Sequence, residues 1–281
     1  MIAGEGSASA GPSRMRGARM RTVEVSADGA KVSCLVAFEN PAGTAKWEGA
    51  VRWLSRLPRG TAVTAWSSGG HGCAVALAAD LLGLHATIAV PEDAKPDRLE
   101  LLDRTSAEVL VVDDLEEAHA RALAAPGVPV PGYDDVATIV AHSALWDAVD
   151  RDGLVFVPVG GGGLAASACL ALGGDRVVGV QHAPATSLSA SLTIGYPARV
   201  DPSGAPVAVR VPKIGRVPLS MMLATTVGTA IVGQVEVADA LGLLHAAGID
   251  AEPAGAIATA AALAFGGGTA LVSGGRPKDQ G

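Results

Sequence analysis

Short apolar runs alternate with alanine-rich segments along this chain, from Thr22 into its C-terminal part. The expected strands, such as Thr61–Trp66, His85–Val90 and Leu154–Val159, are almost continuously apolar, and helical periodicity marks the segments between them. Strands of this kind are buried on both faces, and their alternation with helices requires crossover connections, which make them parallel. We therefore expect an α/β protein whose open, twisted parallel sheets carry helices on both faces.

The remaining elements follow from the same patterns, and a chain of 281 residues is long enough for about two domains. Asp28-Gly29 is expected to turn an initial hairpin. Segment Ser187–Arg216, rich in Pro, Gly and Ser, is expected to be a loop-rich excursion. The other expected strands are Thr22–Val25, Lys31–Phe38, Glu108–Val112, Val177–Val180 and Thr269–Val272. The expected helices are Ala45–Leu57, Cys73–Leu82, Lys95–Arg104, Leu115–Ala125, Asp134–Val149, Leu164–Leu172, Asp239–Ala247 and Ala254–Phe265.

Composition excludes several classes of protein. Hydrophobic residues make up 49% of the chain and charged residues 17%, which excludes intrinsic disorder of the whole chain. The net charge of -7, with no long basic stripe, argues against a nucleic-acid partner and an anionic membrane. Three cysteines without a CxxC pair argue against disulfides and structural zinc and favour a cytoplasmic location. The histidines show no paired ligand spacing, so we assign no metal.

Two segments could be mistaken for targeting or membrane-spanning segments. Pro253–Gly275 carries no charge and is long enough to cross a bilayer, but glycines and a proline interrupt it. It is better interpreted as a buried helix, a turn and a short buried strand. Met1–Met20 has arginines among Gly, Ser and Ala and no continuous apolar core, so we expect a disordered leader and not a signal peptide.

Four consecutive glycines, Gly160, Gly161, Gly162 and Gly163, lie between an expected buried strand and the helix that begins at Leu164. Glycine lets the backbone approach an anion closely, and the N-terminus of a helix adds partial positive charge. A tight turn alone rarely needs four glycines in a row, because their flexibility is entropically costly. The run therefore predicts a site for a phosphate group.

A dinucleotide site is the alternative interpretation of the same glycines. Gly160, Gly162 and Ala165 fit the pattern G-x-G-x-x-A, which requires an acidic residue at the end of the next strand to hold a ribose. The residue there is Gln181, and the strand comes late in the chain. We therefore favour a single phosphate group over a dinucleotide.

Lys46 stands at the beginning of an expected helix, between Ala45 and Trp47. A lone lysine is ordinarily a solvated surface residue, although the N-terminus of a helix disfavours a positive charge. A lysine desolvated by apolar neighbours has a lowered pKa and becomes nucleophilic. A phosphate site together with a buried lysine suggests a Schiff base between Lys46 and pyridoxal 5'-phosphate.

The motifs of the chain, taken in order, resemble those of the fold type II pyridoxal-phosphate enzymes. This superfamily includes tryptophan synthase β chain, threonine dehydratase, serine racemase and cysteine synthase. The family pattern N-P-T-G-S-F-K-x-R-G-A is similar to Asn40–Ala50, and S-S-G-N-H-G to Ser67–Gly72. Val157–Leu164, Ala251–Gly255 and Ser273–Gly275 follow in the family's order, and the histidine at 71 and the Ala-Glu-Pro-Ala-Gly segment favour the threonine dehydratase and serine racemase branch.

The resemblance implies roles for the motif residues. Lys46 would form the Schiff base and later act as acid and base at the substrate Cα. Ser273 would hydrogen-bond the pyridine nitrogen, and a hydroxyl partner there suits β-elimination and β-replacement. The remaining cofactor-binding candidates are Gly70, Gly160, Gly161, Gly162, Gly163 and Leu164.

The resemblance also implies a substrate site at the beginning of the helix after Ser67. There, backbone donors could bind the carboxylate of an amino acid. The substrate-binding candidates are Ser67, Ser68, Gly69, His71 and Gly72, and Ser68 is also a candidate catalytic residue. Plain N-capping is the alternative interpretation of the two serines, and Glu252 is either a site residue or a surface carboxylate.

Three positions depart from the family pattern. Gly70 stands where the family has an asparagine that contacts the phenolic oxygen of the cofactor. Glu48 replaces an arginine, and Arg276 replaces an asparagine. These departures argue against the ordinary serine or threonine dehydratase reaction and allow a specialised substrate.

The resemblance implies a lyase that removes the β-substituent of a β-hydroxy or β-substituted amino acid and releases ammonia. A β-replacement synthase, a racemase and a non-catalytic protein of the same fold are the alternatives. Implied partners are a small amino-acid substrate and a second copy of the chain in a homodimer. The expected domains are a large cofactor-binding domain (21–66 plus 142–281) and a small domain (67–141).

Overall fold

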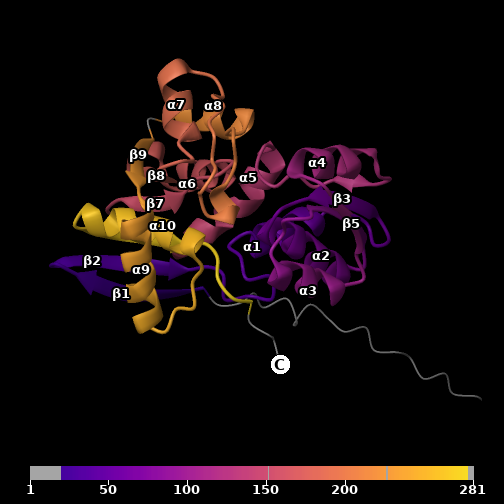
Figure 1. Cartoon of the computed structure of the whole chain (residues 1–281), viewed down its shortest axis with the longest axis horizontal. Helices are drawn as coiled ribbons and strands as arrows, with labels where there is room; N and C mark the ends of the chain where they lie inside the picture. Colours follow the sequence, from indigo (N-terminus) through magenta and orange to yellow (C-terminus); the bar gives the residue numbers. More distant parts are fainter. Residues whose placement is uncertain (1–19, 151, 226, 278–281) are drawn as a thin grey trace, which may run out of the picture.

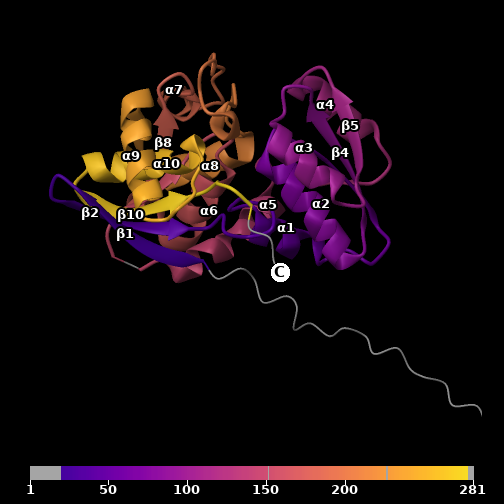
Figure 2. The ribbon, with the colours of Figure 1, turned by 60° about the horizontal axis from the view of Figure 1, so that its bottom comes forward.

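The computed structural model describes residues 20–150, 152–225 and 227–277, so the expected leader, apart from Met20, lies outside the described residues. The described chain is built around two sheets (Figures 1 and 2). The larger has the order β1-β2-β10-β7-β8-β9, formed by Arg21–Ala27, Ala30–Val36, Gly267–Val272, Val155–Pro158, Val177–His182 and Gly228–Val232. The smaller has the order β5-β4-β3-β6, formed by Glu108–Val112, His85–Pro91, Ala62–Trp66 and Val128–Pro129.

Neighbouring strands of both sheets run parallel, as expected, except in the N-terminal hairpin. Asp28 (φ 50°) and Gly29 (φ 83°) connect β1 to β2. Positive φ at two successive turn residues matches the right-handed twist of hairpin strands, and glycine or aspartate adopts it at the least cost. The hairpin expected around these two residues is confirmed.

Alternate residues of the larger sheet enter two different cores, which shows that both faces are covered. Phe156 and Val178 pack with α9 (Gln234–Ala246) and α10 (Pro253–Ala264) on one face. Their neighbours Val155, Val157 and Val177 pack on the other face, against α6 (Gly163–Leu172), α8 (Arg216–Ala224) and the 3-10 helix Ser143–Ala148. These strands are therefore continuously apolar because both of their faces are buried, as expected.

The smaller sheet is covered in the same way. Helices α1 (Trp47–Leu54), α2 (Gly70–Leu82) and α3 (Pro96–Asp103) share one core with it. Helix α4 (Leu115–Ala124) packs against Ala89 and Val112 on the other face. Helix α5 (Val136–His142) contacts both α1 and α6 and so joins the two halves of the molecule. We call residues 47–129 the small-sheet part and residues 20–36 and 143–277 the large-sheet part.

The expected boundary at residue 66 does not coincide with the division between the sheets. Ala62–Trp66, which we expected in the large domain, is β3 and pairs with β4 and β6 of the smaller sheet. Helix α1, expected in the same domain, packs into the core of the small-sheet part. An apolar run predicts a strand but carries no information about its pairing partner, so the sequence could not place β3.

The segment expected to be a loop-rich excursion contains a helix, α7 (Ser187–Ile194), and leads into α8. The side-chain oxygen of Gln181 accepts hydrogen bonds from the amides of Leu188 (2.7 Å) and Ser189 (3.2 Å) in the first turn of α7. Gln181 thus organises a helix, at the position where a dinucleotide site would require a carboxylate. Strands β6 and β9 were not expected from the sequence, and the single helix expected over Asp134–Val149 is α5 followed by the 3-10 helix.

The long uncharged stretch near the C-terminus forms α10 and the buried strand β10, as expected. Most residues of α10 are fully buried against the larger sheet. Within the part of the chain that the structure describes, no helix combines the length and apolar character needed to cross a bilayer.

Candidate functional site

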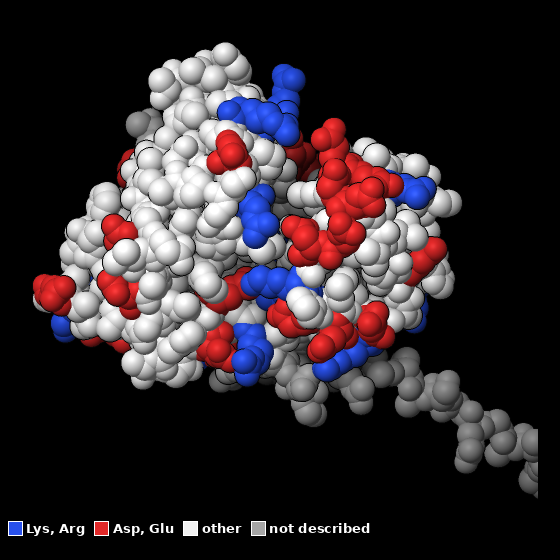
Figure 3. All heavy atoms as spheres, viewed as in Figure 1, with Lys and Arg blue, Asp and Glu red and all other residues white. Residues whose placement is uncertain are grey.

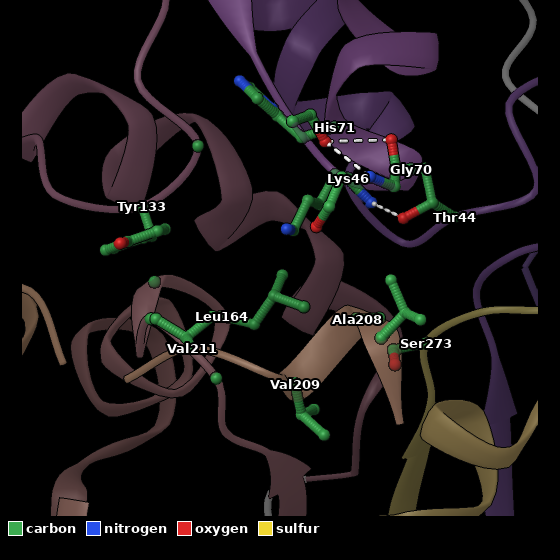
Figure 4. Close-up of a pocket in the computed structure, with 18 of the residues that line it drawn as sticks. Thr44, Lys46, Gly70, His71, Tyr133, Leu164, Ala208, Val209, Val211 and Ser273 are labelled. Atoms are coloured by element: carbon green, nitrogen blue, oxygen red, sulfur yellow. Dashed lines mark hydrogen bonds between the residues drawn. The ribbon is translucent and has the colours of Figure 1, made fainter. Parts of the chain in front are cut away.

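One pocket collects loops that follow the carboxyl ends of parallel strands from both sheets (Figure 4). Such edges are where open α/β sheets bind their ligands. Strand β2 leads to Thr44 and Lys46, β3 to Ser67, β7 to Gly160 and β10 to Ser273. The predicted residues that line this pocket are Lys46, Ser67, Ser68, Gly69, Gly70, His71, Gly160, Gly161, Gly162, Gly163, Leu164 and Ser273.

Gly72 is the predicted site residue that does not line the pocket. It lies within α2, and a side chain there would come within 2.9 Å of Ile88. Several residues that were not expected in the site also line the pocket: Thr44, Trp66, Arg98, Leu115, Gly132, Tyr133, Val207, Ala208, Val209 and Val211. Pro131–Asp135 resembles a motif of the family and stands at the matching place along the chain. This resemblance was the signal in the sequence that could have identified Tyr133. Nothing in the sequence indicated that segment 207–211 folds back over the pocket.

The run Gly160–Gly163, which we call the glycine cradle, offers backbone donors to an anion. The amides of Gly160, Gly161 and Gly162 donate to no described protein atom. Gly162 has φ +92° and is the N-cap of α6, so the positive end of this helix faces the same place. The cradle therefore has the geometry of a phosphate site.

The glycines of the cradle are also required by its packing. A Cβ at Gly161 would overlap the ring of Tyr133, and one at Gly163 would come within 2.9 Å of its Cα. On the other side, a Cβ at Gly160 would lie 3.1 Å from the Cα of Val209. Tyr133 and segment 207–211 thus enclose the cradle from two sides, and Figure 4 shows Tyr133 and Val209 on either side of Leu164.

Residues 40–46, the lysine loop, hold Lys46 in place through a buried asparagine. The Asn40 side chain donates to the carbonyls of Ala37 (3.0 Å) and Thr44 (2.9 Å) and accepts from the amide of Ala42 (3.1 Å). The amide of Ala45 donates to the carbonyl of Ser273 at 2.8 Å. This backbone hydrogen bond therefore fixes Ser273 beside the residue that precedes Lys46.

Lys46 lies in surroundings that favour its neutral amine. It is half-buried, and desolvation lowers the pKa of its ammonium group. Lys46 is the N-cap of α1, where the helix dipole opposes a positive charge. Among the described residues, no carboxylate forms an ion pair with it. These are the conditions under which a lysine acts as a nucleophile or a base.

Two buried histidines lie near Lys46, and both are neutral. Burial first, and the nearby charge of Lys46 second, lower the pKa of His71 to about 4 and that of His142 to about 3. His71 Nε2 bonds the carbonyl of Val130 at 2.9 Å, and a carbonyl only accepts, so Nε2 carries the proton. The Nδ1 atoms of both histidines are buried without a partner among the described residues. The two imidazoles are therefore polar but uncharged groups near Lys46, and His71 is the one that lines the pocket.

The turn before α2 is closed by Ser67. Its hydroxyl accepts from the amide of Gly69 (3.0 Å) and donates to the carbonyl of Gly69 (2.9 Å). Gly69 is the N-cap of α2, and no side chain caps this helix, so neither serine is an ordinary N-cap. The Ser68 hydroxyl bonds no described protein atom. A second helix N-terminus is thus open to an anion on the opposite side of the pocket from the glycine cradle.

Ion pairs connect the two parts of the molecule beside the pocket. Glu252, at the N-cap of α10, bonds Lys95 at 2.7 Å and lies 3.7 Å from the guanidinium of Arg98 on α3. Arg98 is buried and also donates to the carbonyls of Ala42 (2.9 Å) and Gly275 (3.2 Å). Figure 3 shows acidic groups over the small-sheet part and basic groups along the facing edge. Arg210 and Asp93 form a further ion pair at 3.6 Å. Glu252 therefore lines the pocket with its charge already compensated.

Comparisons with known proteins agree with this geometry. The family model "Pyridoxal-phosphate dependent enzyme" matches residues 25–273. The L-threonine ammonia-lyase of Thermotoga maritima is 33% identical over 227 residues, which cover 75% of this chain and 56% of that protein. The L-threonine ammonia-lyase of Geobacter sulfurreducens is 30% identical, over 79% of this chain and 60% of that protein. The chain thus spans little more than half the length of these curated relatives.

Solved structures share the fold over most of the chain. Maize serine racemase superposes with a TM-score of 0.80 at 21% identity, covering 94% of this chain and 90% of that one. The processed form of threonine deaminase isoform 2 from Solanum lycopersicum superposes with a TM-score of 0.77 at 23% identity, covering 87% of this chain and 79% of that one. The fold and the family that the sequence motifs indicated are confirmed. The chain belongs to the pyridoxal-phosphate dependent enzymes, with the fold of the fold type II group and pyridoxal 5'-phosphate as the cofactor of its family.

Proposed function

We propose that this protein is a lyase that eliminates the β-substituent of a β-hydroxy or β-substituted amino acid and releases ammonia. The observation that carries the proposal is the arrangement around Lys46. The glycine cradle lies on one side of the lysine, the open N-terminus of α2 on another, and Ser273 is connected to the lysine loop. Both curated relatives compared above are named L-threonine ammonia-lyases, which supports elimination as the reaction.

The residues of the pocket fit the cofactor. The unpartnered amides of the glycine cradle suit its phosphate, the desolvated amine of Lys46 suits its aldehyde, and the hydroxyl of Ser273 suits its ring nitrogen. When bound, the cofactor supplies an electron sink for the negative charge that develops at the substrate Cα. The chain's own residues supply binding, orientation and proton transfer.

We assign the substrate carboxylate to the N-terminus of α2, where the amides of Gly70 and His71 and the Ser68 hydroxyl are available. This site holds the substrate Cα on the side of Lys46. Lys46 Nζ, whose pKa is lowered by burial, then removes the α-proton. Departure of a β-hydroxyl as water leaves an enamine, and its hydrolysis gives a 2-oxo acid and ammonia. The neutral His71 and His142 add no competing charge beside the amine.

The test is to incubate the protein, loaded with cofactor, with serine, threonine and 3-hydroxyaspartate in both enantiomeric forms. We expect equal amounts of 2-oxo acid and ammonia from at least one of them, and none with Lys46→Ala. Inversion at Cα without ammonia would establish a racemase instead, and product only with an added nucleophile would establish a synthase. Absence of turnover across the panel, with the cofactor bound, would favour a non-catalytic protein.

Two further expectations belong to this proposal: a homodimer and a location in the cytoplasm. The family resemblance supports the first, and the three unpaired, buried cysteines support the second, because reduced thiols are typical of that compartment. Analytical ultracentrifugation of the full chain tests the dimer. A single species with the mass of one chain would contradict it.

A further inference from the structure

Thr44 and Gly70 lie directly against each other at one edge of the pocket. A Cβ at Gly70 would come within 2.8 Å of the Thr44 Cβ and 3.0 Å of its Oγ1. The φ of Gly70 is not positive, so no backbone strain demands glycine there. The threonine side chain therefore occupies the space into which a side chain at position 70 would extend. Figure 4 shows the two residues side by side next to Lys46.

The hydroxyl of Thr44 has a hydrogen to donate. Its Oγ1 accepts from the amide of Lys46 at 3.3 Å, and among the described residues it donates to no atom. The hydroxyl of Ser67, by contrast, is already used on both its donor and acceptor sides. Thr44 is buried, and its own amide and carbonyl are held by the Asn40 side chain. A fixed and uncommitted donor thus points into the pocket.

The chemistry of the cofactor requires a partner on this side of Lys46. In pyridoxal phosphate, the ring carbon that bears the aldehyde lies between the ring carbon with the phosphate arm and the ring carbon with the hydroxyl. Figure 4 shows Tyr133, which covers the glycine cradle, on one side of Lys46, and Thr44 and Gly70 on the other. With the phosphate arm in the cradle, the ring oxygen is directed away from it, toward Thr44.

We propose that the Thr44 hydroxyl donates a hydrogen bond to the ring oxygen of pyridoxal phosphate, and that position 70 is glycine because Thr44 needs its space. The inference rests on the cofactor and not on the lyase reaction. It is therefore tested without substrate, and failure of the proposed function leaves it intact.

A donor at the ring oxygen has a spectroscopic consequence. It withdraws negative charge from that oxygen and so weakens the stabilisation of a proton on the neighbouring nitrogen of Lys46. Removing the donor raises the pH at which the absorption of the bound cofactor changes. A hydrogen bond to a charged group corresponds to a shift of about 1–2 pH units.

The experiment is a pH titration of the cofactor absorption in Thr44→Val, Thr44→Ser and the wild-type holoprotein. Thr44→Val removes the hydroxyl at nearly constant volume, and we expect its midpoint to rise by about 1–2 pH units. Thr44→Ser keeps the hydroxyl and should keep the wild-type midpoint. Thr64→Val is the matched control, because Thr64 Oγ1 is buried without a partner and lies outside the pocket; its midpoint should not move.

A second variant tests the role of position 70. Gly70→Ala retains the Thr44 hydroxyl but pushes it aside, so its midpoint should rise in the same direction. A wild-type midpoint in Thr44→Val, or an equal shift in Thr44→Ser, would overturn the proposal. If Thr44→Val does not retain the cofactor, Thr44→Ala leaves more space, and its midpoint decides the question. Cofactor affinity measured by equilibrium dialysis should fall about tenfold or more with each hydroxyl-free variant.

Discussion

The two sides of the pocket bind by opposite means. The glycine cradle of the large-sheet part presents only backbone amides and a helix N-terminus, and its side chains are absent because Tyr133 and Val209 pack against the glycines. The opposite side depends on side chains: a desolvated lysine, the neutral His71 and a threonine hydroxyl. Substitutions in the cradle should therefore act on retention of the cofactor, and those opposite should act on proton chemistry.

Removing the lysine should have the largest effect. Lys46→Ala should abolish the visible absorption of the bound cofactor and lower ammonia release about a thousandfold or more, because both the covalent anchor and the base are lost. Absorption spectra and a coupled ammonia assay measure the two effects. Phosphate binding at the cradle should survive, since the cradle does not depend on Lys46. A variant that keeps the wild-type absorption would contradict the assignment of Lys46.

A methyl group added to the glycine cradle tests whether close packing requires glycine there. Gly161→Ala drives a Cβ into the Tyr133 ring, so we expect a loss of about 1–3 kcal/mol in stability and weaker cofactor binding. Gly242→Ala, in α9 and outside the pocket, is the matched control, because nothing lies within 4 Å of its Cβ. Urea unfolding and equilibrium dialysis compare the two. Equal effects would contradict the enclosed geometry of the cradle.

The neutral histidines predict a loss of stability in acid. His71 and His142 have pKa values of about 4 and about 3 in the folded protein and an ordinary value of 6.5. The unfolded chain therefore binds more protons below pH 6.5, and stability should fall with falling pH from about 6.5 toward 4 by about 1 kcal/mol per pH unit for each histidine.

The measurement is the free energy of unfolding as a function of pH. His142→Gln should flatten this dependence, and His85→Gln, at an exposed position, should leave it unchanged. An unchanged slope in His142→Gln would show that its imidazole titrates freely in the folded protein.

The ion pairs that join the two sides should contribute least. Lys95→Gln should cost less than about 1 kcal/mol, because its pair with Glu252 is partly exposed. Glu252→Gln should cost about 1–3 kcal/mol, since it removes the less exposed of the two described carboxylates, Glu252 and Asp97, that pair with the buried Arg98 guanidinium. Urea unfolding at low and high salt measures both. A larger loss for Lys95→Gln than for Glu252→Gln would mean that the exposed pair, and not the buried one, holds the parts together.

The elements were largely predictable because each depends on local pattern. Strands β4 and β5 and helices α2, α4 and α10 lie within a few residues of the expected ranges. The Ser-rich α7 was missed, since its first turn is stabilised by Gln181, a residue outside the helix. Strand β3 was expected in the large domain but pairs within the smaller sheet, because pairing depends on contacts that a single apolar run does not specify.

The sequence by itself determined the family, the parallel α/β fold, the glycine cradle and the lysine. Each of these depends on residues that are adjacent in the sequence. Close approach of a backbone requires glycine, and a strand, turn and helix form from one continuous segment of the chain. Only the tertiary structure decided what surrounds them. Tyr133 and segment 207–211 enclose the cradle, and Thr44 occupies the space that Gly70 leaves. His142, from a distant part of the chain, lies near enough to Lys46 for the lysine to lower the pKa of the histidine. Such neighbours come together only where the two parts of the molecule meet. The desolvation that lowers the pKa of Lys46 therefore requires the tertiary structure.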